Sequence, residues 1–557
     1  LAPSVSQEWV AHHPGASATA IPGPAGLLGW AGEMVRDAIG NILRARAARM
    51  PDRVCCAMDE NVYTYAEMDQ RSDALAAGLA QLGAGRGEQV AMLSANRTEL
   101  LELFYGVAKT GAAQVPLNAY LKGEFLLHQL RQSRSGFLVT DAAGREALAP
   151  LRSQLPDLRA VIMLDDAEEG EIAYASLFDC GDAPPRVELT AADTMSILYT
   201  SGTTGLPKGC VASHGYYCRS GEIIGHALEV AEGDVLFAGL PLFHAGARLV
   251  TVTLPLIHGI PAYLQGTFSA RAYFPRAKEV GATLMVAVGA MGAAILATEP
   301  SPADRDHKVT RIMCAPLTLA GQATFRERFG VDPWVDIFGQ TECMPTTLTS
   351  LSSDRRDPLG CGIGAPDLEV ALLDDEGNVL HGEVMGEICL RPNAPYAMFD
   401  GYFGNPTATL EAFRGLWYHS GDNGRRLPSG AFTFVDRKKD SLRRRGENIS
   451  SFELEQAIDA HPGIVESAAV AVASDLGEDD IKACIVVTSP IEPAELFDFF
   501  KNNLPYFAIP RYVDFLDALP RNGVGRVMKH KLREAGNTTE TWDFEALDLT
   551  VAKEERR

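Results

Sequence analysis

The sequence lacks the features that would place this chain on nucleic acid or on an anionic membrane. Its 557 residues include 50 lysines and arginines against 72 aspartates and glutamates, which gives a formal net charge of -22. This acidic balance excludes nonspecific binding to nucleic acid and to anionic membrane surfaces. An anionic ligand must therefore be received by a local basic site.

Cysteine pairs and long apolar runs are also missing. The ten cysteines form no CxxC pair, which favours reduced thiols in a cytoplasmic protein, and no zinc site is predicted. Residues 1–30 contain no basic region followed by an apolar run, so no secretory signal is expected. The apolar stretch Ala282–Ala297 is shorter than the ~20 residues of a membrane span and predicts a buried strand and helix. We expect no membrane insertion.

The pattern of elements predicts an α/β fold. From Asn41 to about residue 340, short apolar strands alternate with helices, which indicates parallel-type sheets covered by helices. Residues 365–436 hold shorter strands between Asp, Gly and Pro turns, typical of a small β-barrel. After Asp436 the pattern indicates a compact α+β unit. We predict a large N-terminal domain over 1–438, with an extension over 1–35, and a small mobile C-terminal domain over 439–557.

The stretch Tyr199–Gly209, YTSGTTGLPKG, alternates hydroxyl side chains with glycines and closes on Lys208. Glycine permits turns of positive φ and a close approach to an anion. Successive N–H groups of such a turn, with hydroxyls and a lysine, form a nest for phosphate. The apolar segment Thr194–Leu198 predicts a strand that leads into the loop. The Walker A pattern does not fit, because Gly209 follows Lys208 where that pattern needs Ser or Thr.

Six motifs in order resemble those of the adenylate-forming superfamily, which includes acyl-CoA synthetases, peptide-synthetase adenylation domains and firefly luciferase. The first is the loop above. The others are PLFHAGAR (Pro241–Arg248), FGQTE (Phe338–Glu342), YHSGD (Tyr418–Asp422), DRKKDSLRRRGENIS (Asp436–Ser450) and PRNGVGRVMKHKL (Pro520–Leu532). The resemblance covers nearly the whole chain and is nearest to acyl-CoA ligases. It implies two half-reactions: a carboxylate and ATP give an acyl-adenylate, and coenzyme A then displaces AMP.

The resemblance implies the site residues, cofactors and partners. Glu342 is the implied ligand of Mg²⁺, since a carboxylate suits a hard cation. The implied ATP or AMP contacts are Thr200, Ser201, Gly202, Thr203, Thr204, Gly205, Lys208, Phe338 on adenine, Thr341, Asp422 on ribose and Arg437. The implied catalytic residues are Thr200, His244, Glu342 and Arg526. His244, Val288, Gly289 and Met291 would line the acyl pocket, whose small neighbours suit a bulky apolar carboxylic acid.

The implied coenzyme A site lies in the C-terminal domain. Arg445 and Gly446 would approach the pantetheine and the phosphates, and Lys439 would be the hinge on which this domain turns between half-reactions. A solvated basic turn is the alternative for Arg443 and Arg444. Neither the oligomeric state nor the identity of the acid follows from the sequence.

The last motif departs from the family pattern at one position. The family places a lysine after the glycine to bridge the carboxylate and the α-phosphate, and here Arg526 follows Gly525. Arginine keeps the charge in a longer planar fork, and misplacing a transition-state cation by ~1 Å can cost ~10²-fold in rate. Either Arg526 or Lys529 substitutes in a complete ligase, or the chain acts mainly on preformed acyl-adenylate and coenzyme A.

Three other functions stay open from the residues alone. A stand-alone adenylation enzyme would load a carrier protein, and a luciferase-like oxygenase would oxidise an adenylate. A non-catalytic nucleotide sensor would retain the phosphate loop with the altered Arg526. Such a sensor would leave His244, Glu342, Lys439 and Gly446 without a purpose.

Overall fold

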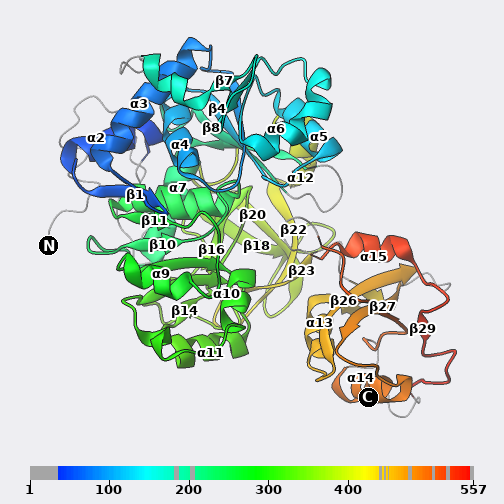
Figure 1. Cartoon of the computed structure of the whole chain (residues 1–557). Coiled ribbons are helices and arrows are strands. Elements are labelled where there is room, and N and C mark those ends of the chain that lie inside the picture. The colour runs from blue at the N-terminus through cyan, green and yellow to red at the C-terminus, as the bar shows by residue number, and fades with distance from the viewer. Residues whose placement is uncertain are drawn as a thin grey trace. The chain divides into compact units, whose positions relative to one another are not determined.

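The structure, a computed structural model, describes residues 36–180, 187–200, 207–437, 442–444, 447–449, 451–473, 479–504, 508–521 and 527–551 (Figure 1). The chain divides into two compact units. Unit 1 takes in Leu1–Val370, Leu390–Tyr418 and Leu427–Phe432, and unit 2 takes in Ala371–Cys389, His419–Arg426 and Thr433–Arg557. The predicted boundary at residue 439 and the hinge Lys439 stay predictions, and residues 1–35 and Lys439 lie outside the described residues.

One seven-stranded sheet of unit 1 has the order β7-β6-β5-β3-β4-β8-β9. Its strands are β3 (Gln89–Leu93), β4 (Ala113–Leu117), β5 (Phe137–Thr140), β6 (Ala160–Met163), β7 (Ile172–Ala173), β8 (Thr194–Tyr199) and β9 (Gly209–Ser213). All neighbours are parallel except β8 and β9, which are antiparallel. Every residue of β4 is buried, as expected of a parallel strand covered on both faces.

The second seven-stranded sheet has the order β14-β13-β12-β10-β11-β1-β2. Its strands are β1 (Val54–Met58), β2 (Asn61–Thr64), β10 (Leu236–Ala238), β11 (Ala262–Leu264), β12 (Leu284–Val288), β13 (Arg311–Ala315) and β14 (Pro333–Trp334). β12 is followed directly by helix α10 (Gly289–Leu296), so Ala282–Ala297 forms the predicted buried strand and helix. Ligands of parallel α/β sheets bind outside the carboxyl ends of the strands, and the predicted acyl-pocket residues Val288 and Gly289 lie at the carboxyl end of β12.

The helices of unit 1 cover these sheets, with α9, α10 and α11 along the second one (Figure 1). The α-helices are α2 (Ile39–Arg49), α3 (Tyr65–Gln81), α4 (Thr98–Thr110), α5 (Gly123–Ser133), α6 (Ala142–Leu148), α7 (His214–Ala227), α8 (Leu254–His258), α9 (Tyr273–Glu279), α10, α11 (Leu319–Phe329) and α12 (Pro406–Ala412). A capping box of Thr64 and Glu67 begins α3, and Gly83, at φ +93°, follows its end. Short 3₁₀ turns span Ala149–Gln154, Tyr174–Cys180 and Pro302–Arg305, and a π-helix spans Ala247–Thr253.

The short strands predicted between residues 365 and 436 are present. The larger sheet has the order β19-β18-β20-β22-β21, with β23 paired to β22, and β15-β16-β17 form a smaller sheet. The strands are β15 (Ile337–Gln340), β16 (Cys343–Leu348), β17 (Ile363–Gly364), β18 (Leu368–Leu373), β19 (Val379–Leu380), β20 (Met385–Pro392), β21 (Phe413–Arg414), β22 (Trp417–Arg426) and β23 (Phe432–Arg437).

The remainder of unit 2 mixes helices and strands, as the sequence predicts for the C-terminal part. Its elements are β24 (Leu442–Arg444), β25 (Glu447–Ile449), α13 (Ser451–Asp459), β26 (Ile464–Ala473), β27 (Asp479–Val487), α14 (Pro493–Asn503), β28 (Tyr512–Phe515), α15 (Lys529–Ala535) and β29 (Trp542–Asp543). The α/β fold class is therefore confirmed. Among the described residues, none of the helices is both long and apolar enough to cross a bilayer.

Candidate active site

The ends of the predicted phosphate loop are joined by their backbones. Thr200 N–H donates to Lys208 O at 3.0 Å, and Tyr199 pairs with Gly209 where β8 and β9 run antiparallel. The two ends of the loop therefore start from neighbouring antiparallel strands of a buried sheet. Five predicted contacts of the loop, Ser201, Gly202, Thr203, Thr204 and Gly205, lie outside the described residues, as does Leu206.

Thr341 and Glu342 form the turn of a β-hairpin. β15 and β16 pair in antiparallel register with Gln340 opposite Cys343, so the two residues of the turn stand at its tip. Phe338 lies in β15 opposite Thr347 and is half-buried. Glu342 is 8% exposed. The motif FGQTE thus places an aromatic ring, a hydroxyl and a carboxylate on one short hairpin.

One face of helix α7 anchors this hairpin. The Tyr216 hydroxyl donates to Thr341 O at 3.0 Å, and the Ser220 hydroxyl donates to Met344 O at 2.6 Å. The Arg219 guanidinium donates to Pro345 O at 2.9 Å and makes two hydrogen bonds, at 2.9 and 2.7 Å, to the carboxylate of Asp367. Residues three and four apart share a helix face, so the three side chains all reach carbonyl groups of the hairpin.

Tyr402 joins the phosphate loop to the Glu342 hairpin. Its hydroxyl donates to Glu342 Oε1 at 2.8 Å, and Lys208 Nζ lies 4.9 Å from the centroid of its ring. Backbone hydrogen bonds hold the segment 399–403 against both sides: Phe399 N–H donates to Glu342 O, and Phe403 N–H donates to Gly209 O, each at 2.8 Å. The phenol therefore lies between the ammonium of the loop and the carboxylate of the hairpin.

The groups around Glu342 remain protonated. Burial first, and the charge of Glu342 second, raises the pKa of the Tyr402 phenol and of the Cys210 thiol. Burial likewise raises the pKa of Tyr418, whose hydroxyl hydrogen-bonds with Tyr402 and lies 3.3 Å from Gln340 Oε1. We call Glu342, Tyr402, Tyr418 and Cys210 the Glu342 cluster. Within the cluster, the Tyr402 hydroxyl donates to the Glu342 carboxylate and orients it.

The donor set suits the magnesium ion implied by the resemblance. Mg²⁺ prefers oxygen ligands and is usually held by one or two carboxylates together with phosphates of the substrate. Glu342 offers such a carboxylate, with one oxygen oriented by Tyr402, beside a lysine at the end of the phosphate loop. Glu342 is therefore a fitting protein ligand for this ion.

His244 lies in a turn that the buried Arg248 side chain contacts. The His244 side chain is exposed, yet surrounding atoms displace enough water that desolvation lowers the pKa of its imidazole. Arg248 is 2% exposed; its guanidinium contacts Leu242 O and the Tyr217 hydroxyl, at 3.5 and 3.3 Å, and the Gln114 amide oxygen. The turn that carries His244 is thus fixed to the core, while its imidazole stays neutral and accessible.

The predicted acyl-pocket residues after β12 differ in exposure. Val288 is 44% exposed at the end of the strand, whereas Met291 is 8% exposed and packs in the core. A Cβ at Gly289 would lie 2.2 Å from the carbonyl oxygen of Pro316, so this position accepts only glycine. Of the three, Val288 therefore presents the apolar surface that a ligand could touch.

Asp422 is a buried residue of unit 2. It lies in β22, is 2% exposed, and its N–H donates to the Ser420 hydroxyl at 3.1 Å. Arg437 ends β23, and Arg443 and Arg444 lie in β24; their side chains are not among those described. Arg445, Gly446 and Arg526 lie outside the described residues. The roles predicted for these residues stay predictions.

Several residues that shape this site were missed by the sequence reasoning. Tyr402 is 60 residues from Glu342 in the chain, and Arg219 is 148 residues from Asp367. The available signals were indirect: hydroxyl and guanidinium side chains at 216, 219 and 220 with helical spacing, and Arg248 at the end of the quoted motif. Nothing in their local patterns identifies the partner that each one contacts.

Comparisons with known proteins show the family of the chain. Residues 43–403 match the family model described as AMP-binding enzyme, and residues 453–526 match that of the AMP-binding enzyme C-terminal domain. The crotonobetaine/carnitine–CoA ligases of Shigella flexneri and of Escherichia coli O45:K1 (strain S88) are 31% and 30% identical to the chain over 487 residues. The match covers 85% of this chain and 93% of each relative.

Solved structures show the same fold. The O-succinylbenzoate coenzyme A synthetase from Bacillus subtilis, in complex with ATP and magnesium ion, is 27% identical with a TM-score of 0.77, and the match covers 88% of this chain and 99% of that one. An anthranilate CoA ligase in complex with anthranoyl-AMP is 23% identical with a TM-score of 0.80, covering 90% and 97%, and shows a likeness of fold.

Proposed function

This chain belongs to the AMP-binding enzyme family, and from that premise we propose that it is an acid–thiol ligase that forms acyl-CoA through an acyl-adenylate. The observation that carries the proposal is the position of Tyr402 between Lys208 and Glu342. Phosphoryl chemistry needs cations placed against the phosphates and little else from the protein. An ammonium and a metal-binding carboxylate, fixed by one phenol, supply that arrangement.

The residues of the site have separable roles in this proposal. Lys208 and the hydroxyls of its loop bind the β- and γ-phosphates, Thr341 donates to the α-phosphate, and Phe338 stacks on adenine. Mg²⁺, when held by Glu342, neutralises charge on the phosphates. Asp422 accepts hydrogen bonds from the ribose hydroxyls, because an ionised carboxylate can take two vicinal donors. His244 and Val288 border the acid, which we infer to be bulky and apolar.

The finer proposal is that the adenylation half-reaction is weak because Arg526 stands where the family has lysine. Lys529, the other cation near this position, is engaged within unit 2: its ammonium lies 2.9 Å from Glu455 Oε1 and also donates to the Ser451 hydroxyl. Releasing it would cost both interactions. Thioester formation from a supplied adenylate should not need Arg526, since Arg445 and Gly446 would serve that step after rotation about Lys439.

The test offers the purified chain a panel of carboxylic acids with ATP and, in parallel, the matched synthetic acyl-adenylates, each with coenzyme A. We expect acyl-CoA, read by mass, from at least one adenylate, and faster than from the corresponding acid with ATP. Thioester on a pantetheinylated carrier protein but not on coenzyme A would favour a stand-alone adenylation enzyme. ATP binding without any thioester would favour a sensor and overturn the proposal.

The Arg526→Lys variant tests whether Arg526 limits the adenylation half-reaction. It restores the compact cation of the family, so acid-dependent pyrophosphate release should rise by up to about 10²-fold. Thioester formation from a supplied adenylate should stay as in the parent. An unchanged rate of pyrophosphate release would mean that Arg526 does not limit adenylation.

A further inference from the structure

Three side chains of unit 2 bring a carboxylate, a thiol and an imidazole together. Glu387 and Cys389 are two residues apart in β20 and therefore point to the same face, and His419 lies in the neighbouring strand β22. Their ligand atoms all lie within 4.8 Å of one another, and among the described residues no other group of three such donors converges in this way. We call these residues the Glu387 cluster.

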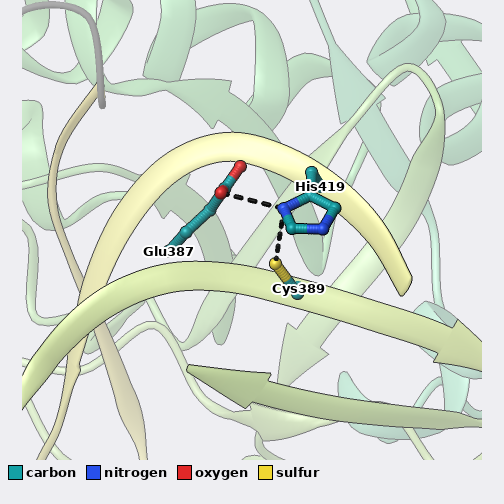
Figure 2. Close-up of side chains that lie close together, drawn as sticks. All are labelled: Glu387, Cys389 and His419. Carbon is teal, nitrogen blue, oxygen red and sulfur yellow. Dashed lines mark hydrogen bonds and ion pairs between the residues drawn. The ribbon is translucent and has the colours of Figure 1, made fainter. Parts of the chain in front are cut away.

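Both other side chains of the cluster point at one nitrogen of the imidazole, as Figure 2 shows. Glu387 Oε2 lies 2.9 Å from His419 Nδ1, and Cys389 Sγ lies 3.4 Å from the same atom. A neutral imidazole nitrogen offers either one proton or one lone pair. If Nδ1 carries the proton, it donates to the carboxylate and the thiol sulfur can be only a weak second acceptor; if it does not, its lone pair faces the carboxylate.

A cation among the three atoms would satisfy all three groups at once, because the imidazole lone pair, the thiolate and the carboxylate oxygen would all point at it. Tetrahedral zinc, with bonds of about 2.0 Å to nitrogen and about 2.3 Å to sulfur, separates such ligands by about 3.5 Å. The observed 3.4 Å between sulfur and nitrogen matches this spacing. The carboxylate, at 2.9 Å, needs to withdraw by about half an ångström.

The surroundings of the cluster favour a bound ion. Cys389 is fully buried, the side chain of Glu387 is 3% exposed, and that of His419 is 11% exposed. Gly421 N–H donates to Glu387 Oε1 at 3.0 Å, which orients the carboxylate and leaves Oε2 toward the imidazole. Such a supporting hydrogen bond is typical of ligands in metal sites. The partly exposed imidazole gives the ion a route from solvent.

We propose that Glu387, Cys389 and His419 bind a borderline divalent cation of the zinc class, with a fourth position open to water. A thiolate and an imidazole select such ions over Mg²⁺, which prefers oxygen ligands alone. Three protein ligands leave a coordination position vacant, so the ion exchanges with solvent more readily than in a closed four-ligand site. The ion cross-links the neighbouring strands β20 and β22.

Cobalt(II) tests the proposal, because a thiolate ligand gives it a charge-transfer band in the near ultraviolet. The full chain, freed of metal by chelation, is titrated with Co²⁺ in the presence of millimolar Mg²⁺. We expect one Co²⁺ per chain, a thiolate band, displacement by Zn²⁺ and a higher melting temperature with either ion. The Cys389→Ser variant should lose the band.

Matched variants show whether the charge-transfer band comes from Cys389 or from another thiol. Cys361→Ser removes a half-buried thiol of unit 1 that donates to Phe432 O, and it should leave the band unchanged. Glu387→Gln keeps the thiolate, so it should retain the band while weakening Co²⁺ binding at least about tenfold. This weakening still tests the site if Cys389→Ser fails to fold. Absence of the band from the parent, or its persistence in Cys389→Ser, would overturn the proposal.

Discussion

Two buried glutamates, Glu342 in unit 1 and Glu387 in unit 2, lie in contrasting surroundings. Glu342 stands at the tip of a hairpin and accepts from a phenol, with hydroxyl groups around it. Glu387 lies within a strand, beside an imidazole nitrogen and a thiol. Oxygen-rich surroundings favour a hard cation, and nitrogen and sulfur ligands favour a softer one. The same residue type therefore serves two kinds of cation in our proposals, and its neighbours decide which.

The supports of the two clusters also differ. The Glu342 hairpin depends on side chains of α7 and on the ion pair of Arg219 with Asp367, all distant in sequence. The Glu387 carboxylate is oriented by the backbone of Gly421 in an adjacent strand. We therefore expect single side-chain changes to disturb the first cluster more than the second.

Asp367→Asn should have the largest effect. Asp367 and Arg219 are both fully buried, and removing one charge leaves the other without compensation, which typically costs 3–5 kcal/mol, or about 4 kcal/mol of unfolding free energy here. Chemical denaturation monitored by tryptophan fluorescence measures the loss. The control is Glu369→Gln, two residues further along, whose ion pair with Arg391 is about half exposed and should contribute at most about 1 kcal/mol. Equal losses in both variants would contradict the distinction.

Glu342→Gln should come next. The amide still accepts from Tyr402, so the hairpin stays folded, but the charge that would hold Mg²⁺ is lost. We expect acid-dependent pyrophosphate release to fall by about 10²–10³-fold, since metal stabilisation is worth several kcal/mol. Calorimetry of ATP binding with and without Mg²⁺ gives an independent readout, and the affinity gained from Mg²⁺ should disappear. Retention of that gain would remove Glu342 from the metal site.

Tyr402→Phe should have a smaller effect on the same measurements. It removes a hydrogen bond to a charged group, worth about 1.5–3 kcal/mol, so we expect at least a tenfold loss in adenylation. Thioester formation from a supplied adenylate should be unaffected. Tyr174→Phe is the matched control, because the Tyr174 hydroxyl also donates to a buried glutamate, Glu102, at 2.7 Å. A comparable loss of adenylation in the control would mean that general destabilisation causes the effect.

His214→Gln should have the smallest effect and act through pH. His214 is the first residue of α7, and burial lowers its pKa to about 4. The His214 Nδ1 accepts a hydrogen bond from Ile39 N–H at 3.2 Å. The unfolded chain therefore binds a proton that the folded chain does not between about pH 6.5 and pH 4, so acid destabilises unit 1. Between pH 7.5 and 5.5 the loss should be about 1 kcal/mol, and the variant should not show it. Parallel pH profiles of parent and variant would contradict this.

The sequence predicted the α/β alternation and the strand β8 before the phosphate loop, and it singled out the motif that carries Glu342, because each depends on local pattern or on a quoted motif. It did not identify Tyr402 or Arg219, because their partners come from sheet pairing and helix packing over long separations in the chain. His419 appeared inside a quoted motif, yet no zinc site was predicted. Cys389 lies 30 residues earlier, and only the pairing of β20 with β22 brings the two together.

In the predicted acyl pocket, Gly289 is a position that cannot be varied to change the preference for the acid. Because even a methyl group at this position would clash with the carbonyl oxygen of Pro316, substitutions there would destabilise the fold rather than alter the selectivity for the acid. The preceding residue, Val288, has open space and is therefore the better position to vary first. Screening would then compare larger and smaller aliphatic side chains at that single codon against acids of graded length.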